Sequence, residues 1–327
     1  MNKIKFHIGL LVIATTAFLS SCENDYENQL PSIAAIAVEG VDFSILEAAA
    51  IQGDVALTLS NSNPNDLSGK YTVFAPTNAG FARLGFNTPG SLGGLQNSFL
   101  TNTLLYAVSN GNLSSGSIVA GGTSQSALGP NRRFITRGSD KFINGSKIIA
   151  TDVAASNGTV HVIDKVLIAS GADIVQTAIA LQTAQVFKQK ELTFLVEAIV
   201  YAGLAEALTA SAGSPSFTVF APNDAAFKAL GPILGISMNV PTDVRQIPVA
   251  TLRAVLLSSV INDGGKFTSE MNAGAVASLS GANITFGAYN NGVLTVKGNG
   301  SSEANMVIPD VQTTNGVVHV IDRVLLP

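Results

Sequence analysis

The chain contains one cysteine, no tryptophan and three histidines among its 327 residues. Because a single cysteine cannot form a disulfide within the chain, stability has to come from packing. With no tryptophan and five tyrosines, the chain has few aromatic platforms for stacking on sugar rings. Hydrophobic residues make up 46% of the chain, which is ample material for a core.

Charge is also scarce, because charged residues make up only 12% of the chain, about half the usual quarter. The 18 Lys and Arg residues form no basic patch, which excludes nucleic acid as an expected partner. No glycine-rich stretch carries the Lys-Ser/Thr of a phosphate-binding loop, and no Gly-x-Ser-x-Gly elbow precedes a helix. We therefore expect no cofactor and no enzymatic activity.

The N-terminus has the pattern of a secretion signal. Lys3 and Lys5 precede an apolar run from Ile8 to Leu19, which is shorter than the roughly 20 residues of a membrane-spanning helix. The run ends in Leu-Ser-Ser-Cys at residues 19–22, which resembles a bacterial lipobox. We interpret residues 1–21 as a lipoprotein signal peptide and Cys22 as the lipidated residue. The alternative is a chance cysteine within an ordinary signal peptide.

Residues 22–32 are polar and acidic and are predicted to form a flexible tether. The cluster Glu23, Asp25 and Glu27 resembles the surface-export signal of Bacteroidetes-type lipoproteins. It predicts an outer-membrane lipoprotein exposed on the cell surface, with the periplasmic face as the alternative.

Two sequence motifs occur twice. YTVFAPTNAGF at 71–81 and FTVFAPNDAAF at 217–227 share seven of eleven positions, and the segments 152–168 and 310–326 share eleven of seventeen. Copies so far apart exceed the period of a solenoid, which is about 20–50 residues, so each copy is predicted to be a whole domain. We place the domains at 33–169 and 172–327. The short junction predicts that they pack against each other.

Each half shows the same order of elements. Apolar residues recur at helical spacing in 41–53 and 191–203, and short buried strands are expected at 72–74 and 218–220. Each half closes with a hairpin in which an Asn-Gly pair is expected to form the loop. Helices together with antiparallel strands predict the α+β class.

The repeated blocks resemble the two conserved blocks of the fasciclin (FAS1) family. The resemblance covers essentially all of the chain after the tether, and it implies two tandem domains, each a β-wedge sandwich flanked by helices. It also implies a role in cell-surface adhesion or extracellular-matrix-type interaction. The motif residues that carry it are Thr72, Phe74, Pro76, Asn157, Gly158 and His161, and their counterparts Thr218, Phe220, Pro222, Asn315, Gly316 and His319.

Some members of the family carry an adhesive Asp-Ile pair ahead of the second block. The matching pairs here are Asp152-Val153 and Asp310-Val311. An exposed carboxylate beside a branched apolar side chain can coordinate a cation bound to a receptor. The alternative is a structural strand end, in which the Asp accepts hydrogen bonds from nearby backbone N–H groups.

Two other features of the sequence bear on the function that the resemblance implies. Many family members carry a Tyr-His pair between the blocks, but the first domain keeps only Tyr106 and the second domain keeps neither residue, which argues against integrin-type recognition there. His161 and His319 are the only histidines after the signal peptide, too few for a zinc site, which needs three or four ligands. We interpret each as a partly buried structural histidine that is hydrogen-bonded to the loop of the first block. The alternative is a His–Asp catalytic pair, with Asp164 or Asp322, or half of a metal site.

These observations predict a non-enzymatic, lipid-anchored surface protein that binds a surface or matrix glycoprotein or a glycan. The alternative function is a glycan-binding or scaffolding component of an outer-membrane polysaccharide-uptake complex.

Overall fold

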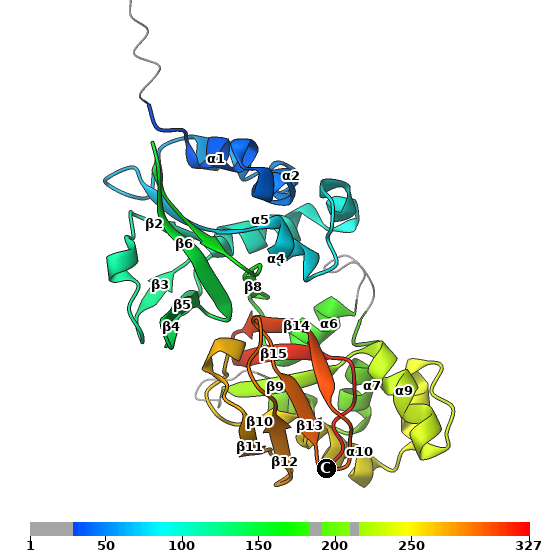
Figure 1. The fold of residues 1–327 in the computed structure, drawn as a ribbon. Coiled ribbons are helices and arrows are strands. Elements are labelled where there is room, and N and C mark those ends of the chain that lie inside the picture. Colours follow the sequence, from blue (N-terminus) through cyan, green and yellow to red (C-terminus); the bar gives the residue numbers. More distant parts are fainter. Residues whose placement is uncertain (1–28, 183–190, 210–215) are drawn as a thin grey trace, which may run out of the picture. The chain divides into compact units, whose positions relative to one another are not determined.

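The structure is a computed structural model that describes residues 29–182, 191–209 and 216–327. Residues Pro31–Pro327 form one compact unit, which contains two domains of the same construction (Figure 1). Cys22 and the expected signal peptide lie outside the described residues.

The first domain is a mixed sheet with helices packed on it. The strand order is β2-β1-β7-β6-β5-β4-β3. The strands are β1 (Tyr71–Pro76), β2 (Val108–Asn110), β3 (Thr123–Gln125), β4 (Asn131–Arg137), β5 (Asp140–Ile143), β6 (Ser146–Ala155) and β7 (Gly158–Ile163). The helices are α1 (Ile33–Glu39), α2 (Ser44–Gln52), α3 (Ala56–Ser60), α4 (Asn78–Ala82) and α5 (Asn97–Ala107), with 3-10 turns η2 (Val41–Phe43), η3 (Pro89–Gly94) and η4 (Ser115–Ser117).

The second domain repeats this order as β10-β9-β15-β14-β13-β12-β11. Its strands are β9 (Phe217–Pro222), β10 (Val260–Ile261), β11 (Gly274–Ala277), β12 (Asn283–Phe286), β13 (Thr295–Gly298), β14 (Ala304–Thr313) and β15 (Gly316–Ile321). Its helices are α6 (Ile174–Leu181), α7 (Thr193–Tyr201), α8 (Ala205–Leu208), α9 (Asp224–Leu234) and α10 (Val249–Leu257), with 3-10 turns η5 (Pro241–Gln246) and η6 (Thr268–Glu270). Between the domains, β8 (Ile168–Ala169) pairs with β14 in parallel.

The two repeated motifs lie side by side at the centre of each sheet. β1 carries the first motif and runs parallel to β7, which carries the second, with Phe74 opposite His161. β9 and β15 pair in the same way, with Phe220 opposite His319. The domains are therefore α+β as predicted, but each sheet is mixed, whereas the sequence predicted antiparallel strands alone.

Both faces of the central pair are covered, which explains why these strands are apolar without alternation. In the first domain, Val73 and Val160 contribute to the core beneath helices α1, α2 and α5. On the opposite face, Phe74 and Ile163 contribute to a second core formed with strands β4 to β6. The second domain has the same two cores.

The hairpin of each domain also anchors its first helix. The side chain of Asn157 accepts a hydrogen bond from the N–H of Ile33, at the start of α1, at 2.9 Å. Asn315 accepts one from Ile174, at the start of α6, at 3.0 Å. The loop residues are Ser156 and Asn157, and not the expected Asn-Gly pair, because Gly158 already belongs to β7.

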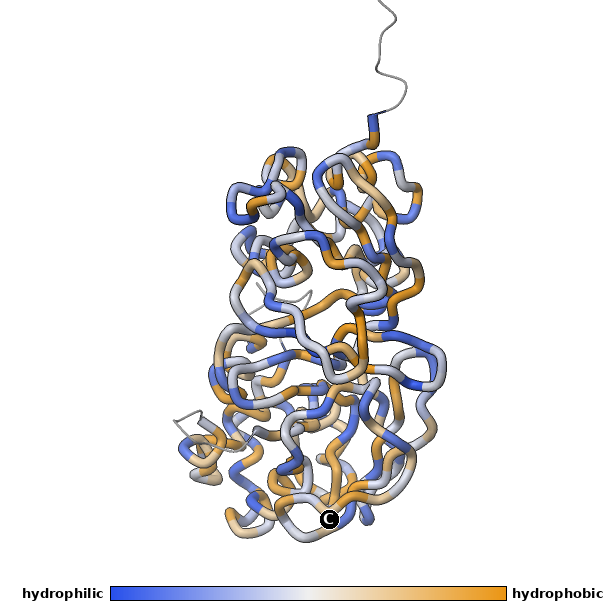
Figure 2. The backbone as a smooth tube through the Cα atoms, turned by 90° about the vertical axis from the view of Figure 1, so that its left-hand side faces the viewer, coloured by the Kyte–Doolittle hydropathy of each residue, from blue (hydrophilic) through white to orange (hydrophobic). Residues whose placement is uncertain are grey.

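Short runs of hydrophobic and hydrophilic residues alternate along the described chain (Figure 2). No helix among the described residues is long and apolar enough to cross a membrane.

Candidate adhesion site and the contact between the domains

Asp152 and Asp310 each occupy a β-bulge before the hairpin. The pairing register shifts between Ala150 and Val153 in β6, and between Ile308 and Val311 in β14. At the bulge, Asp152 has a φ of 59° and Asp310 a φ of 65°. Aspartate tolerates this left-handed conformation better than most residues, so the Asp fits the bulge in both domains.

The bulge directs a backbone N–H of each domain at the buried histidine. The N–H of Asp152 donates to Nδ1 of His161 at 3.3 Å, and that of Asp310 donates to Nδ1 of His319 at 3.1 Å. Nε2 of each ring lies 2.9–3.0 Å from a carbonyl oxygen, of Leu113 or of Lys266. The neutral tautomer with its proton on Nε2 satisfies both contacts.

Burial lowers the pKa of both histidines, although the carbonyl contacts and the neighbouring aspartates oppose the shift. The Nε2 bonds run to the segments after β2 and β10, and not to the loop of the first motif as expected. The first motif instead supplies Phe74, whose ring centroid lies 5.3 Å from that of His161. These histidines therefore have structural contacts on both ring nitrogens.

The two carboxylates also have the same local role. Asp152 accepts the N–H of Ser115, the first residue of η4, at 2.8 Å. Asp310 accepts the N–H of Thr268, the first residue of η6, at 2.7 Å. Each Asp thereby caps a 3-10 turn, in keeping with the structural alternative stated above.

Their surroundings differ. Asp152 is exposed, and hydrogen bonds from the side chain and N–H of Ser115 lower the pKa of its carboxyl. The side chain of Asp310 is only 9% exposed, and its Oδ2 lies 2.6 Å from Nζ of Lys165, which comes from the first domain. Burial alone would raise the pKa of the Asp310 carboxyl, but Lys165 and His319 hold it below the usual value.

Lys165 is fully satisfied in this contact. Its ammonium donates to Oγ1 of Thr268 at 3.0 Å and to the carbonyl oxygen of Gly292 at 2.7 Å, in addition to Asp310. A buried charge is tolerated only when it is paired and hydrogen-bonded in this way. Lys165 therefore ties the end of the first domain to the bulge of the second.

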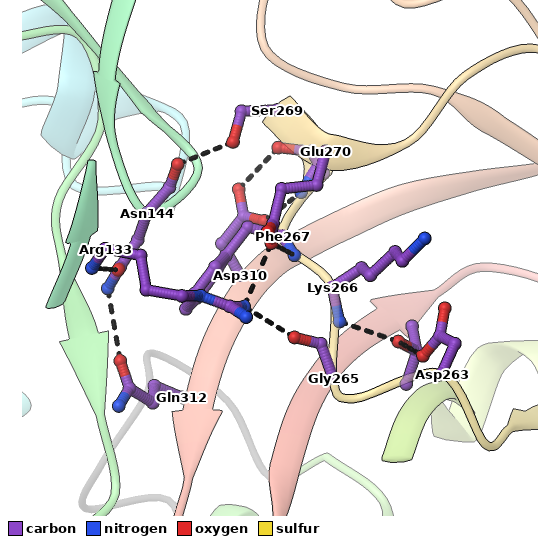
Figure 3. A network of polar contacts seen from close by, with 12 residues as sticks. Arg133, Asn144, Asp263, Gly265, Lys266, Phe267, Ser269, Glu270, Asp310 and Gln312 are labelled. Carbon is purple, nitrogen blue, oxygen red and sulfur yellow. Dashed lines mark hydrogen bonds and ion pairs between the residues drawn. The ribbon is translucent and has the colours of Figure 1, made fainter. Parts of the chain in front are cut away.

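Further polar contacts join the domains around η6 (Figure 3). Arg133 lies 2.9 Å from Glu270 and donates to the carbonyl oxygen of Gly265 at 2.6 Å. The hydroxyl of Ser269 donates to the carbonyl oxygen of Asn144 at 2.6 Å, and the side chain of Asn144 also contacts Gln312. These contacts hold the two domains against each other, as the short junction between them predicted.

Two residues show how closely the domains approach. Tyr106 is fully buried, and its hydroxyl donates to the side chain of Gln312 in the second domain. A Cβ atom at Gly145 would lie 2.0 Å from Oδ2 of Asp310, so a larger residue there would displace this carboxylate. The hydroxyl that the first domain retains from the Tyr-His pair is thus used inside the molecule.

The two candidate Asp-Val pairs for adhesion therefore lie in different environments. In the first domain, Asp152 is exposed and Val153 is half-buried. In the second domain, Asp310 is covered by Lys165 and Val311 is 1% exposed. The sequence analysis did not single out Lys165, Arg133 or Glu270, although Lys165 and Arg323 occupy the same position of the two motif copies, which was a signal for a repeated cation.

Among the residues that the structure describes, no group of three or more His, Cys, Asp or Glu side chains is placed to hold a metal ion. The polar side chains described above bond to backbone groups or to the other domain. Among these side chains, that of Asp152 is exposed to solvent.

The fold and its paired motifs define a tandem repeat of one α+β domain. A family model described as "Fasciclin domain" matches residues 41–169 and 190–327. The chain therefore belongs to the fasciclin domain family, as its motifs predicted.

Several relatives share part of their sequence with the chain. Protein sll1483 of Synechocystis is 36% identical over 135 residues, which is 41% of this chain and 66% of that protein. Immunogenic protein MPT70 of Mycobacterium tuberculosis is 37% identical over 100 residues, or 31% of this chain and 50% of that protein. Human periostin is 27% identical over 261 residues, or 79% of this chain and 28% of periostin.

The chain thus spans less than two thirds of the length of each of these relatives, and none of them has the name of an enzyme. A solved FAS1 domain pair from the insect cell adhesion molecule fasciclin I covers 79% of this chain and 89% of its own, with 18% identity and a TM-score of 0.38.

Proposed function

We propose that this protein is a non-enzymatic, lipid-anchored cell-surface protein that mediates adhesion to a surface or matrix glycoprotein or glycan. Membership of the fasciclin family supports a role in adhesion of this type. The proposed domain boundaries remain those of the sequence analysis, with the tether at 22–32 joining a lipid on Cys22 to the first domain.

The observation that carries the proposal is the exposure of Asp152 on a bulge of β6. A carboxylate held in one orientation by the N–H of Ser115 loses little freedom on binding, which favours affinity. It can complete the coordination of a cation bound to a receptor, while Val153, which packs partly against the core, offers the exposed part of its side chain as an apolar contact. Since Asp310 is paired with Lys165, the first domain supplies the proposed adhesive face.

The proposal is tested first on intact cells. Cells that produce the wild-type chain are treated with protease without lysis, beside cells that produce Cys22→Ala. Loss of the wild-type domains on intact cells, with no digestion of cell-bound Cys22→Ala protein, supports a lipid-anchored surface protein.

Adhesion of the same cells to wells coated with matrix glycoproteins is then measured. The proposal expects more adherent wild-type cells than Cys22→Ala cells. Wild-type domains that are protected until lysis would contradict the surface location, and equal adhesion of the two strains would contradict the function.

A further inference from the structure

The contact between the domains brings together an apolar-acidic strip and a basic pocket. The strip is Val307–Asp310 of β14 in the second domain. It covers a cavity of about 220 Å³ whose walls in the first domain include Gly80, Leu84, Lys165 and Val166. Within this contact, the Lys165–Asp310 pair supplies complementary charge.

The first domain has a strip of the same construction, which we call the acceptor strip. It consists of residues 149–152 of β6, which match residues 307–310 of β14 in register and carry the same bulge. Ile149 is 50% exposed and its counterpart Val307 38%, whereas Thr151 and Asp152 are exposed and their counterparts Pro309 and Asp310 are half-buried. The described residues leave this strip uncovered.

The second domain has the matching pocket, which we call the donor pocket. Its volume is about 90 Å³, and its walls include Ala226, Leu230, Arg323 and Val324. By the alignment of the repeated motifs, these residues correspond to Gly80, Leu84, Lys165 and Val166 of the first domain. Arg323 is exposed, whereas its counterpart Lys165 is 5% exposed.

We propose that the donor pocket of one copy of the chain binds the acceptor strip of a second copy, so that the contact between the domains is repeated between molecules. Arg323 then faces Asp152 as Lys165 faces Asp310, and Ile149 enters the pocket. The two surfaces differ and lie on different domains, so the contact is heterologous and links copies head to tail.

The contact between copies has fewer polar groups than the contact within the chain. Within the chain, Glu270 of η6 pairs with Arg133, and Gln312 of β14 bonds Asn144. At the matching positions of the first domain, η4 has Ser117 and β6 has Ala154, which cannot form these contacts. The association is therefore weaker than the intramolecular contact and depends on protein and salt concentration. A high local concentration on a membrane favours it.

Sedimentation velocity of the purified chain, from about 1 µM to about 500 µM, tests the proposal. Wild-type protein is expected to form species larger than a dimer as concentration rises. Arg323→Glu reverses the charge of the donor pocket. Asp152→Asn removes the charge of the acceptor strip while keeping a side chain that tolerates the left-handed backbone. Each variant alone is expected to remain monomeric.

A mixture of the two variants gives the sharper result. The donor pocket of Asp152→Asn can bind the acceptor strip of Arg323→Glu, and no further copy can be added, so the mixture is expected to stop at dimers. Arg245→Glu, a charge change of the same size at the exposed residue Arg245, is expected to associate as the wild type does.

Three results would overturn the proposal: a wild-type protein that stays monomeric throughout, an Arg323→Glu variant that associates like the wild type, or a mixture that forms no dimers. Association and adhesion both use Asp152 and therefore compete for it. Arg323→Glu retains Asp152, so it should bind a surface ligand without associating, and the failure of one proposal can be distinguished from the failure of the other.

Discussion

Nζ of Lys165 lies 2.6 Å from Oδ2 of Asp310, and these atoms join the end of the first domain to the bulge of the second. The side chains are 6% and 9% exposed. The pair Lys147–Asp140 has nearly the same separation, 2.7 Å, but its side chains are 39% and 43% exposed. The chain thus offers two ion pairs that differ mainly in burial.

We expect Lys165→Met to destabilise the protein by about 3–5 kcal/mol, because it leaves the carboxylate of Asp310 buried without its cation. Lys147→Met, the exposed control, should cost no more than about 1 kcal/mol. Urea unfolding followed by circular dichroism measures both. Equal effects of the two substitutions would show that the buried pair does not hold the domains together.

The buried histidines predict that stability falls as the pH is lowered from 7.5 to 5.5. Burial holds the pKa of His161 and of His319 below that of the unfolded chain, so the unfolded state binds protons first in this range. The slope should not exceed about 1.4 kcal/mol per pH unit for each histidine. The lowered pKa of Asp310 acts below about pH 4, outside this range.

The check is urea unfolding at several pH values for the wild type and for His319→Asn, whose amide oxygen can replace Nδ1 as acceptor of the Asp310 N–H. The variant should show roughly half of the wild-type slope, since one of two histidines is removed. A wild-type stability that does not change between pH 5.5 and 7.5 would contradict the assignment of neutral, buried rings.

The close approach of β7 to β1 predicts that Gly158→Ala is strongly destabilising. An added Cβ would lie 2.0 Å from the carbonyl oxygen of Tyr71, and no side-chain rotation relieves a contact with backbone. We expect a loss of more than about 2 kcal/mol. At Gly93 nothing lies within 4 Å of such a Cβ, so Gly93→Ala should change stability by no more than about 0.5 kcal/mol. Thermal unfolding of the two variants makes the comparison, and similar melting temperatures would refute the argument.

Much of the fold was predictable because the chain repeats its own motifs. The helices expected at 41–53 and 191–203 are present as α2 and α7, although α1 and α6 precede them in the two domains. The N-caps Thr77 and Asn223, which lie within the first motif directly after Pro76 and Pro222, accept hydrogen bonds from the N–H groups of Gly80 and Ala226. These are local features, and local sequence carries their signal.

The parallel pairing of β1 with β7 was not predictable in the same way. An apolar strand that is buried on both faces shows no alternation, and its pattern does not identify a partner strand far along the chain. The different environments of Asp152 and Asp310 were also hidden, because the two segments are alike in sequence. Only the position of Lys165 in the folded chain separates them.

The central claim is that the first domain binds a surface ligand through Asp152. The most direct measurement is saturation binding of the purified chain to a panel of immobilised matrix glycoproteins and glycans, below the concentration at which copies associate. The account predicts that Asp152→Asn lowers the affinity at least about tenfold, whereas Asp140→Asn, another exposed aspartate of the first domain, leaves it unchanged. Binding that is equal for the wild type and Asp152→Asn, or no binding above an uncoated surface, would contradict it.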